Sequence, residues 1–232
     1  VVISRQLGSA ELGLYFLAAK LAFLPTVISS QVFGTVAFPL YARLQADVRR
    51  VVEVFRTIFT SVLVMLTPVF VLIIALAPSL VENVLGPRWE GTASLIRLLG
   101  IVGTLGLVGD GAVPVFKGLG QPYRFAALEA VQSLVLIVFA WWFTGHLGLI
   151  GAGLAWFPAI VGSLVASTVF LRKLLPSPFA GIRAPMGAAL VASALGAIVA
   201  LGIGELVPGL VGFLLASSLA VTVVGLPLWV LD

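Results

Sequence analysis

The chain contains no cysteine, one histidine and few charged residues, which make up 9% of its 232 positions. The absence of cysteine excludes disulfides, thiolate metal sites and thiol catalysis. An ordinary soluble domain carries about 25% charged residues, so a chain with this little charge cannot cover a water-facing surface of normal polarity. The composition therefore excludes a soluble globular enzyme and a disordered protein.

Hydrophobic residues are abundant instead: they make up 61% of the chain, and its mean hydropathy is +1.21. The apolar runs are continuous and about 20 residues long, which is the length of helix that crosses about 30 Å of hydrocarbon. The strands of an outer-membrane barrel would instead alternate apolar and polar residues over about 10 positions. The sequence predicts an all-α, polytopic membrane helical bundle of about seven transmembrane helices.

Turn residues divide the apolar sequence into seven expected spans. They cover residues 12–44, 51–76, 92–119, 123–143, 149–171, 186–203 and 210–231. A connector is expected at 77–91, with one or two interfacial turns at 79–85. Prolines within the spans should kink them. The chain does not begin with Met and opens inside an apolar run, so we expect a fragment of a longer protein.

Basic residues follow the expected loops in strict alternation. Nine of the thirteen lie in or beside alternate loops: Arg43, Arg49, Arg50, Arg56, Lys117, Arg124, Arg172, Lys173 and Arg183. Loops rich in Lys and Arg stay on the cytoplasmic side of a membrane. We therefore expect a multi-pass protein of the cytoplasmic (inner) membrane whose first span enters from outside and whose C-terminus, after Trp229, is cytoplasmic.

Three ionisable side chains are expected deep within spans: Lys20, Asp110 and Glu129. A charge at the bilayer centre costs at least about 2.5–3.5 kcal/mol, so such residues are candidates for a functional site. Two interpretations stay open. Lys20 could pair with Asp110 or Glu129 and lock helices together, or the three could line a water-filled cavity that handles a charged substrate.

Signals for catalysis and for cofactors are weak. The single histidine, His146, lies in a short loop and is expected to be a solvated polar residue. No group of His or carboxylate residues has metal-ligand spacing, and the glycines lie on small-residue helix faces that favour close packing. We expect no catalytic residue, no metal and no cofactor.

Five motifs occur in order along the chain. They are GSAELGLYFLAAKL at 8–21, FPLYARLQAD at 38–47, LGPRW at 85–89, LGQP at 119–122 and GLIGAGLA at 148–155. Together they resemble the polysaccharide-transport flippases of the multidrug/oligosaccharidyl-lipid/polysaccharide exporter superfamily. The resemblance runs from the start to about Lys173. It divides the chain into a matching transmembrane bundle, 1–175, and two additional helices, 176–232.

The resemblance implies a fold of two helical bundles around a central cavity, of which this chain looks like the second, C-terminal one. It implies export of a lipid-linked oligosaccharide by alternating access, for lipopolysaccharide or another polysaccharide. Lys20 falls where the family commonly has a basic residue, whereas Asp110 maps to no family motif. The implied partners are the lipid-linked substrate, membrane lipids, the N-terminal bundle of the same protein and polysaccharide assembly enzymes, with no nucleic acid.

Three other readings stay open. Another secondary transporter, for small molecules or ions, would need a denser coupling-ion site. An integral membrane enzyme of polysaccharide assembly would usually carry paired acids or a histidine in a large outer loop, and the loops here are short. A structural or assembly subunit is the third alternative.

Overall fold

The computed structural model describes residues 6–206. Within that range the chain is helical and has no strand. In order, the elements are α2 (Ser9–Ala22), α3 (Leu24–Val32), η1 (Phe33–Ala37), α4 (Phe38–Leu44), α5 (Val48–Leu80), η2 (Val81–Leu85), η3 (Pro87–Trp89), α6 (Thr92–Asp110), α7 (Val113–Gly118), α8 (Pro122–Leu154), α9 (Trp156–Leu174) and α10 (Arg183–Leu206). η1 and η2 are π-helical turns, and η3 is a short 3-10 turn.

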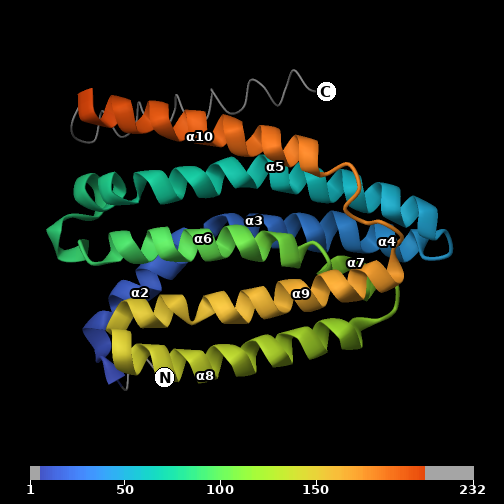
Figure 1. Ribbon diagram of the computed structural model, residues 1–232, viewed down its shortest axis with the longest axis horizontal. Coiled ribbons are helices and arrows are strands. Elements are labelled where there is room, and N and C mark those ends of the chain that lie inside the picture. The colour runs from blue at the N-terminus through green and yellow to red at the C-terminus, as the bar shows by residue number, and fades with distance from the viewer. Residues whose placement is uncertain (1–5, 207–232) are drawn as a thin grey trace.

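The long helices lie side by side as a bundle (Figure 1). Four of them are long and apolar enough to cross a membrane, and the bent pair Ser9–Ala22 and Leu24–Leu44 makes a fifth span within the part that the structure describes. A shorter apolar helix, Ala184–Val199, lies within α10. The prediction of an all-α membrane bundle is confirmed. The expected span at 210–231 and the C-terminus lie outside the described residues.

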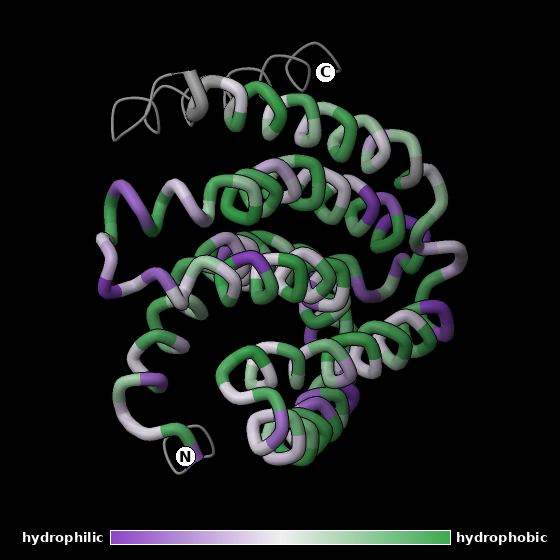
Figure 2. Tube along the Cα trace, turned by 60° about the vertical axis from the view of Figure 1, so that its left-hand side comes forward, coloured by the Kyte–Doolittle hydropathy of each residue, from purple (hydrophilic) through white to green (hydrophobic). Residues whose placement is uncertain are grey.

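The expected loops alternate between two ends of the bundle. The connections α4–α5, α7–α8 and α9–α10, which carry the basic residues, lie at one end, here called the basic end (Figure 1). Figure 2 shows hydrophobic residues along the helices and most hydrophilic ones near the connections. At the basic end, Arg56 Nη2 donates a hydrogen bond of 2.7 Å to the Ser177 carbonyl oxygen. That this end faces the cytoplasm stays a prediction.

One expected boundary is wrong. The second span does not end near residue 76, because α5 and η2 continue without a break to Leu85 and include Pro78. An apolar sequence at membrane depth keeps its helix because no water is present to satisfy freed backbone groups. The turn expected between the fourth and fifth spans is confirmed: α8 leaves helical geometry at Gly148, whose φ of 61° favours glycine, and the chain reverses direction before α9 begins at Trp156.

Two prolines break their spans as predicted. Pro25 lies in the first turn of α3, where the first span bends by 45° after α2. Pro114 lies in the first turn of α7, which is separated from α6 by Gly111 and Ala112. Proline is tolerated in a first helical turn, where its missing N–H has no helical partner. α6 packs against α8 and α9, and the ring of Phe23, at the break before α3, lies close to that of Trp156 at the start of α9.

The buried residues form two clusters on either side of these breaks. The larger cluster, nearer the basic end, contains Tyr41, Phe55, Phe59 and Phe116. The smaller one joins α2 to α5 and α6 through small and aliphatic side chains such as Ala18. α10 packs along α5. The division into a bundle at 1–175 and two further helices at 176–232 stays a prediction.

Candidate functional site

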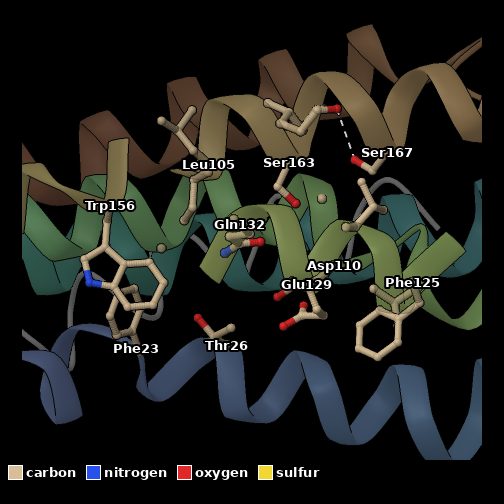
Figure 3. Close-up of a pocket in the computed structure, with 17 residues that line it drawn as sticks. Phe23, Thr26, Leu105, Asp110, Phe125, Glu129, Gln132, Trp156, Ser163 and Ser167 are labelled. Carbon is tan, nitrogen blue, oxygen red and sulfur yellow. Dashed lines mark hydrogen bonds between the residues drawn. The ribbon is translucent and has the colours of Figure 1, made fainter. Parts of the chain in front are cut away.

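A cavity of about 200 Å³ lies among α3, α6, α8 and α9, and all four belong to membrane-spanning segments. Its polar lining consists of Thr26, Asp110, Glu129, Gln132, Ser163 and Ser167 (Figure 3). Aromatic side chains complete the lining at Phe23, Phe125 and Trp156. No Lys or Arg of the described part of the chain lines the cavity. The site is therefore rich in hydrogen-bond acceptors and carries no positive charge of its own.

Helical spacing explains why these residues share one cavity. On α8, Phe125, Glu129 and Gln132 are separated by four and three residues, so they lie on one face. On α9, Ser163 and Ser167 are four residues apart and face α6 and α8 in the same way. Each helix thus contributes a short polar stripe to an otherwise apolar surface.

Glycines of α6 make the close approach of its neighbours possible. Gly103, Gly106 and Gly109 recur every third residue on the face that lines the cavity. A Cβ atom at Gly103 would lie 2.6 Å from Phe70 Cε1, and one at Gly106 would lie 3.3 Å from Ile160 Cδ1. Small residues at such positions let membrane helices pack closely. Here they also bring Asp110, at the end of α6, up to the faces of α8 and α9.

The two carboxylates lie next to each other in the close-up view (Figure 3). The Asp110 side chain is partly buried, whereas Glu129 is exposed in the protein alone. Among the side chains that the structure describes, the only ion pair joins Arg50 to Asp47, so neither carboxylate is neutralised by a described Lys or Arg. Two adjacent carboxylates at membrane depth repel one another when both are ionised, and a proton or a bound cation would relieve that repulsion.

The hydroxyl groups of the cavity are only partly satisfied by the protein. Ser167 Oγ donates a hydrogen bond of 3.0 Å to the carbonyl oxygen of Leu164. Thr26 Oγ1 is buried and has no hydrogen-bond partner among the described residues. A buried hydroxyl without a partner is costly, so Thr26 is available to a ligand, a water molecule or an ion in the cavity.

A second cavity, of about 460 Å³, continues from the carboxylates toward the basic end. It shares Asp110, Glu129 and Phe125 with the first cavity and is also lined by residues of α3, η1, α4 and α7. Lys117 lines it with its Nζ atom 4.1 Å from the centre of the Phe125 ring. The carboxylates therefore lie where the two cavities meet, and the second cavity leads from them to a cation.

The aromatic residues hold the opposite side of the first cavity. Trp156 Nε1 donates a hydrogen bond of 2.8 Å to the Tyr15 hydroxyl. The rings of Phe23 and Trp156 lie 5.5 Å apart at their centres. These contacts join the start of α9 to α2 and to the break between α2 and α3.

The structure brings together two of the three residues singled out in the sequence. Asp110 and Glu129 line both cavities, whereas Lys20 lines neither. Lys20 is exposed in the last turn of α2 and forms no ion pair with a described carboxylate. The interpretation in which Lys20 neutralises Asp110 or Glu129 is therefore not supported within residues 6–206, and a role of Lys20 toward substrate stays a prediction.

Sequence reasoning missed the four neutral polar residues of the site. Ser163 and Ser167 carry a spacing signal, because they lie four residues apart in an apolar segment, and Gln132 lies three residues after Glu129. Thr26 has no such spacing signal. It could be identified only from the structure, in which the break before α3 turns it toward α8.

The chain is similar to proteins of bacterial polysaccharide biosynthesis. Its residues 1–94 match a family model described as polysaccharide biosynthesis protein. The teichuronic acid biosynthesis protein TuaB of Bacillus subtilis is 23% identical over 154 residues, which cover 61% of this chain and 32% of that relative. The lipopolysaccharide biosynthesis protein WzxC of Escherichia coli is 24% identical over 183 residues, or 77% of this chain and 37% of the relative.

A third relative, the amylovoran biosynthesis protein AmsL of Erwinia amylovora, is 26% identical over 186 residues, which cover 79% of this chain and 46% of the relative. The matched part thus spans between about a third and a half of the length of these relatives. No solved structure matches the chain. The comparisons confirm the resemblance to a polysaccharide exporter family that the sequence motifs indicate.

Proposed function

We propose that this chain forms one helical bundle of a transporter that flips a lipid-linked oligosaccharide across the cytoplasmic membrane by alternating access. The similarity to three polysaccharide biosynthesis proteins supports the substrate class. The observation that carries the proposal is the polar cavity between membrane-spanning helices, lined by Asp110 and Glu129 with four neutral polar side chains. The protein acts as a carrier and not as an enzyme.

The physical task explains why such a cavity is useful. The lipid tail of the substrate can remain in the bilayer, but its polar head must cross hydrocarbon, where each unpaired polar group costs several kcal/mol. A cavity with hydrogen-bond partners at membrane depth lowers that cost. Binding must stay weak enough for the head to leave on the other side.

The cavity is suited to one part of the substrate. Carboxylates accept hydrogen bonds and donate none when ionised, so Asp110 and Glu129 suit sugar hydroxyls and would repel a pyrophosphate. Gln132 and the serines can both donate and accept, which suits the varied orientation of hydroxyls on a sugar. Lys20, on the exposed face of α2 outside the cavity, is the residue that we assign to the anionic head.

The carboxylate pair also suits energy coupling. A proton or monovalent cation that enters between Asp110 and Glu129 would relieve their repulsion and favour a different packing of α6 against α8.

One observation favours a second candidate, export of small organic cations. The first cavity combines two carboxylates with the rings of Phe23, Phe125 and Trp156. Carboxylates and aromatic faces both attract cations, and none of the described Lys or Arg residues lines this cavity. The two candidates differ in what cells lose when the carboxylates are removed.

The test compares Asp110→Asn and Glu129→Gln with Glu53→Gln, a control that removes an exposed carboxylate of α5 away from both cavities. Surface polymer and membrane abundance are measured in cells that carry each variant in the protein. We expect polymer export to fall at least tenfold at near-normal abundance in the cavity variants and to be unchanged in the control. Normal export in both cavity variants would overturn the assignment of this site. Loss of tolerance to toxic cations, with normal export, would favour the second candidate.

A further inference from the structure

A second concave site lies at the basic end, on the flank of α8 opposite to the carboxylates. This groove, of about 200 Å³, lies between α8 and α9 and is lined by Tyr123, Arg124, Ala127, Phe170 and Lys173. None of the described residues that line it is acidic. The groove therefore has two cations and no carboxylate of its own, and it is independent of the proposed function.

Arg124 contacts both aromatic residues of this groove. Its guanidinium lies 5.4 Å from the centre of the Phe170 ring and 5.9 Å from that of Tyr123. Arg124 Nη1 donates to the Phe170 carbonyl oxygen at 3.4 Å, and Nε donates to the Tyr123 hydroxyl at 3.4 Å. A guanidinium has five N–H donors, so three of them remain for a ligand. The planar fork of Arg is matched to phosphate oxygens.

Lys173 adds a second, mobile cation. It is exposed, lies in the last turn of α9 and forms no ion pair with a described carboxylate. A flexible ammonium acts as a point charge toward an anion. An anion between Arg124 and Lys173 would thus contact the planar guanidinium of Arg124 and the flexible ammonium group of Lys173.

The surface that continues from the groove is apolar and exposed. Along α8, Ala127 is followed at helical spacing by Val131, Leu134 and Val138, whose exposed fractions are 58%, 64% and 55%. α8 lies at the edge of the bundle, with α9 along one side (Figure 1). In the most apolar 18 residues of this helix, only 11% of the positions are buried in the protein. A molecule whose phosphate lies on Arg124 can therefore extend an apolar chain along α8.

We propose that this groove binds an anionic phospholipid of the bilayer, with its phosphate between Arg124 and Lys173 and an acyl chain along Val131 and Leu134. Basic pockets between transmembrane helices at one membrane face are typical binding sites for such headgroups. Tyrosine, as at position 123, is typical of the membrane–water interface. The apolar stripe distinguishes a lipid from a free phosphate ion, which would gain nothing from it.

The test measures lipid binding to the purified protein in a neutral detergent by native mass spectrometry, with phosphatidylglycerol as the probe and phosphatidylcholine as the neutral comparison. Each Lys or Arg near an anionic lipid surface contributes about 1 kcal/mol, or roughly fivefold in affinity. We expect Arg124→Gln with Lys173→Gln to weaken phosphatidylglycerol binding about 25-fold, with little change for phosphatidylcholine. The control, Arg43→Gln with Arg49→Gln, removes two exposed cations of the same end outside the groove and should change binding less than threefold.

Lys173→Gln alone keeps the proposal testable if the double variant does not fold, because this exposed side chain makes no hydrogen bond in the described part of the chain, and we expect a loss of about fivefold. An equal loss in the control would show general attraction to the basic end and would overturn the proposal. Displacement of phosphatidylglycerol by millimolar inorganic phosphate would overturn it in favour of a free anion site. Displacement by a polyprenyl phosphate at lower concentration would assign the groove to the transported lipid instead.

Discussion

The glycine that follows Asp110 offers a sharp test of how the site is positioned. Gly111 is buried at the end of α6, where a Cβ atom would overlap the ring of Phe59. Its φ of −62° is ordinary for any residue, so Gly111→Ala introduces no backbone strain. The expected effect of this substitution therefore comes from the added methyl group alone.

Phe59 has little room to yield. Its side chain is 2% exposed. The centre of its ring lies 5.0 Å from that of Phe55 and 5.9 Å from that of Phe179. Overpacking of a well-filled core costs about 1–3 kcal/mol, so we expect Gly111→Ala to lower the free energy of unfolding by that amount. The alternative response, a shift of the α6–α7 junction, would move Asp110 and lower transport as well.

The matched control is Gly162→Ala on α9, where a Cβ atom would meet nothing within 4 Å. Because Ala favours a helix over Gly by up to about 1 kcal/mol, this variant should be neutral or slightly more stable. Unfolding of the purified protein in detergent is followed for both variants. Phe59→Leu combined with Gly111→Ala should recover part of the loss, with a coupling of about 0.5–3 kcal/mol. If Gly111→Ala is as stable as Gly162→Ala, the packing described around Phe59 is wrong.

Three further predictions follow from the same structure. Lys20→Met should leave membrane abundance near normal and lower export, and Asp110→Asn should not restore it, because the two groups are not paired; normal export at normal abundance would refute the role of Lys20. In this cysteine-free chain, a cysteine at Gln45 should resist an impermeant thiol reagent in intact cells while one at His146 reacts, and the opposite pattern would reverse the orientation. Tyr15→Phe removes the acceptor of an interhelical hydrogen bond and should lower the free energy of unfolding by about 0.6–1.7 kcal/mol; an unchanged value would mean that this bond does not hold α9 to α2.

Sequence patterns were sufficient to predict a helix boundary where glycine and proline mark the turn. The expected boundary between the spans at 92–119 and 123–143 is confirmed, because Gly120 has a positive φ and Pro122 begins α8. The end of α5 could not be predicted, because Pro78 and the polar residues after it are typical of a connector in water. In a membrane the same residues stay helical, and Asn83 Nδ2 donates to the Ser79 carbonyl oxygen instead of to solvent.

The charged residues of the candidate site could be predicted from the sequence, whereas its neutral polar residues could not. Asp110 and Glu129 stand out because charge is rare in spans, and they do line the same cavity. Ser163 and Ser167 do not stand out, because small polar residues are common at helix contacts in membranes. Which helix faces meet depends on the break at Phe23 and the reversal after Gly148. Pro25 and the glycines before the fifth span predict where these breaks lie, but not the directions that the helices take after them. Lys20 was grouped with the acids by depth alone, and depth does not say which way a side chain faces.

The length of α5 has a consequence for the bilayer itself. Between Arg56 and Glu82, the helix runs through residues 57–81 without a charged side chain. At about 1.5 Å per residue this segment is about 37 Å long, whereas the hydrocarbon core of a typical bilayer is about 30 Å thick. Tilting the helix or thickening the surrounding lipid accommodates the excess, at a cost of fractions of a kcal/mol per Å. The acyl-chain length of the surrounding lipids therefore affects the tilt of α5. Longer-chain lipids form a thicker bilayer, in which this helix can stand more upright.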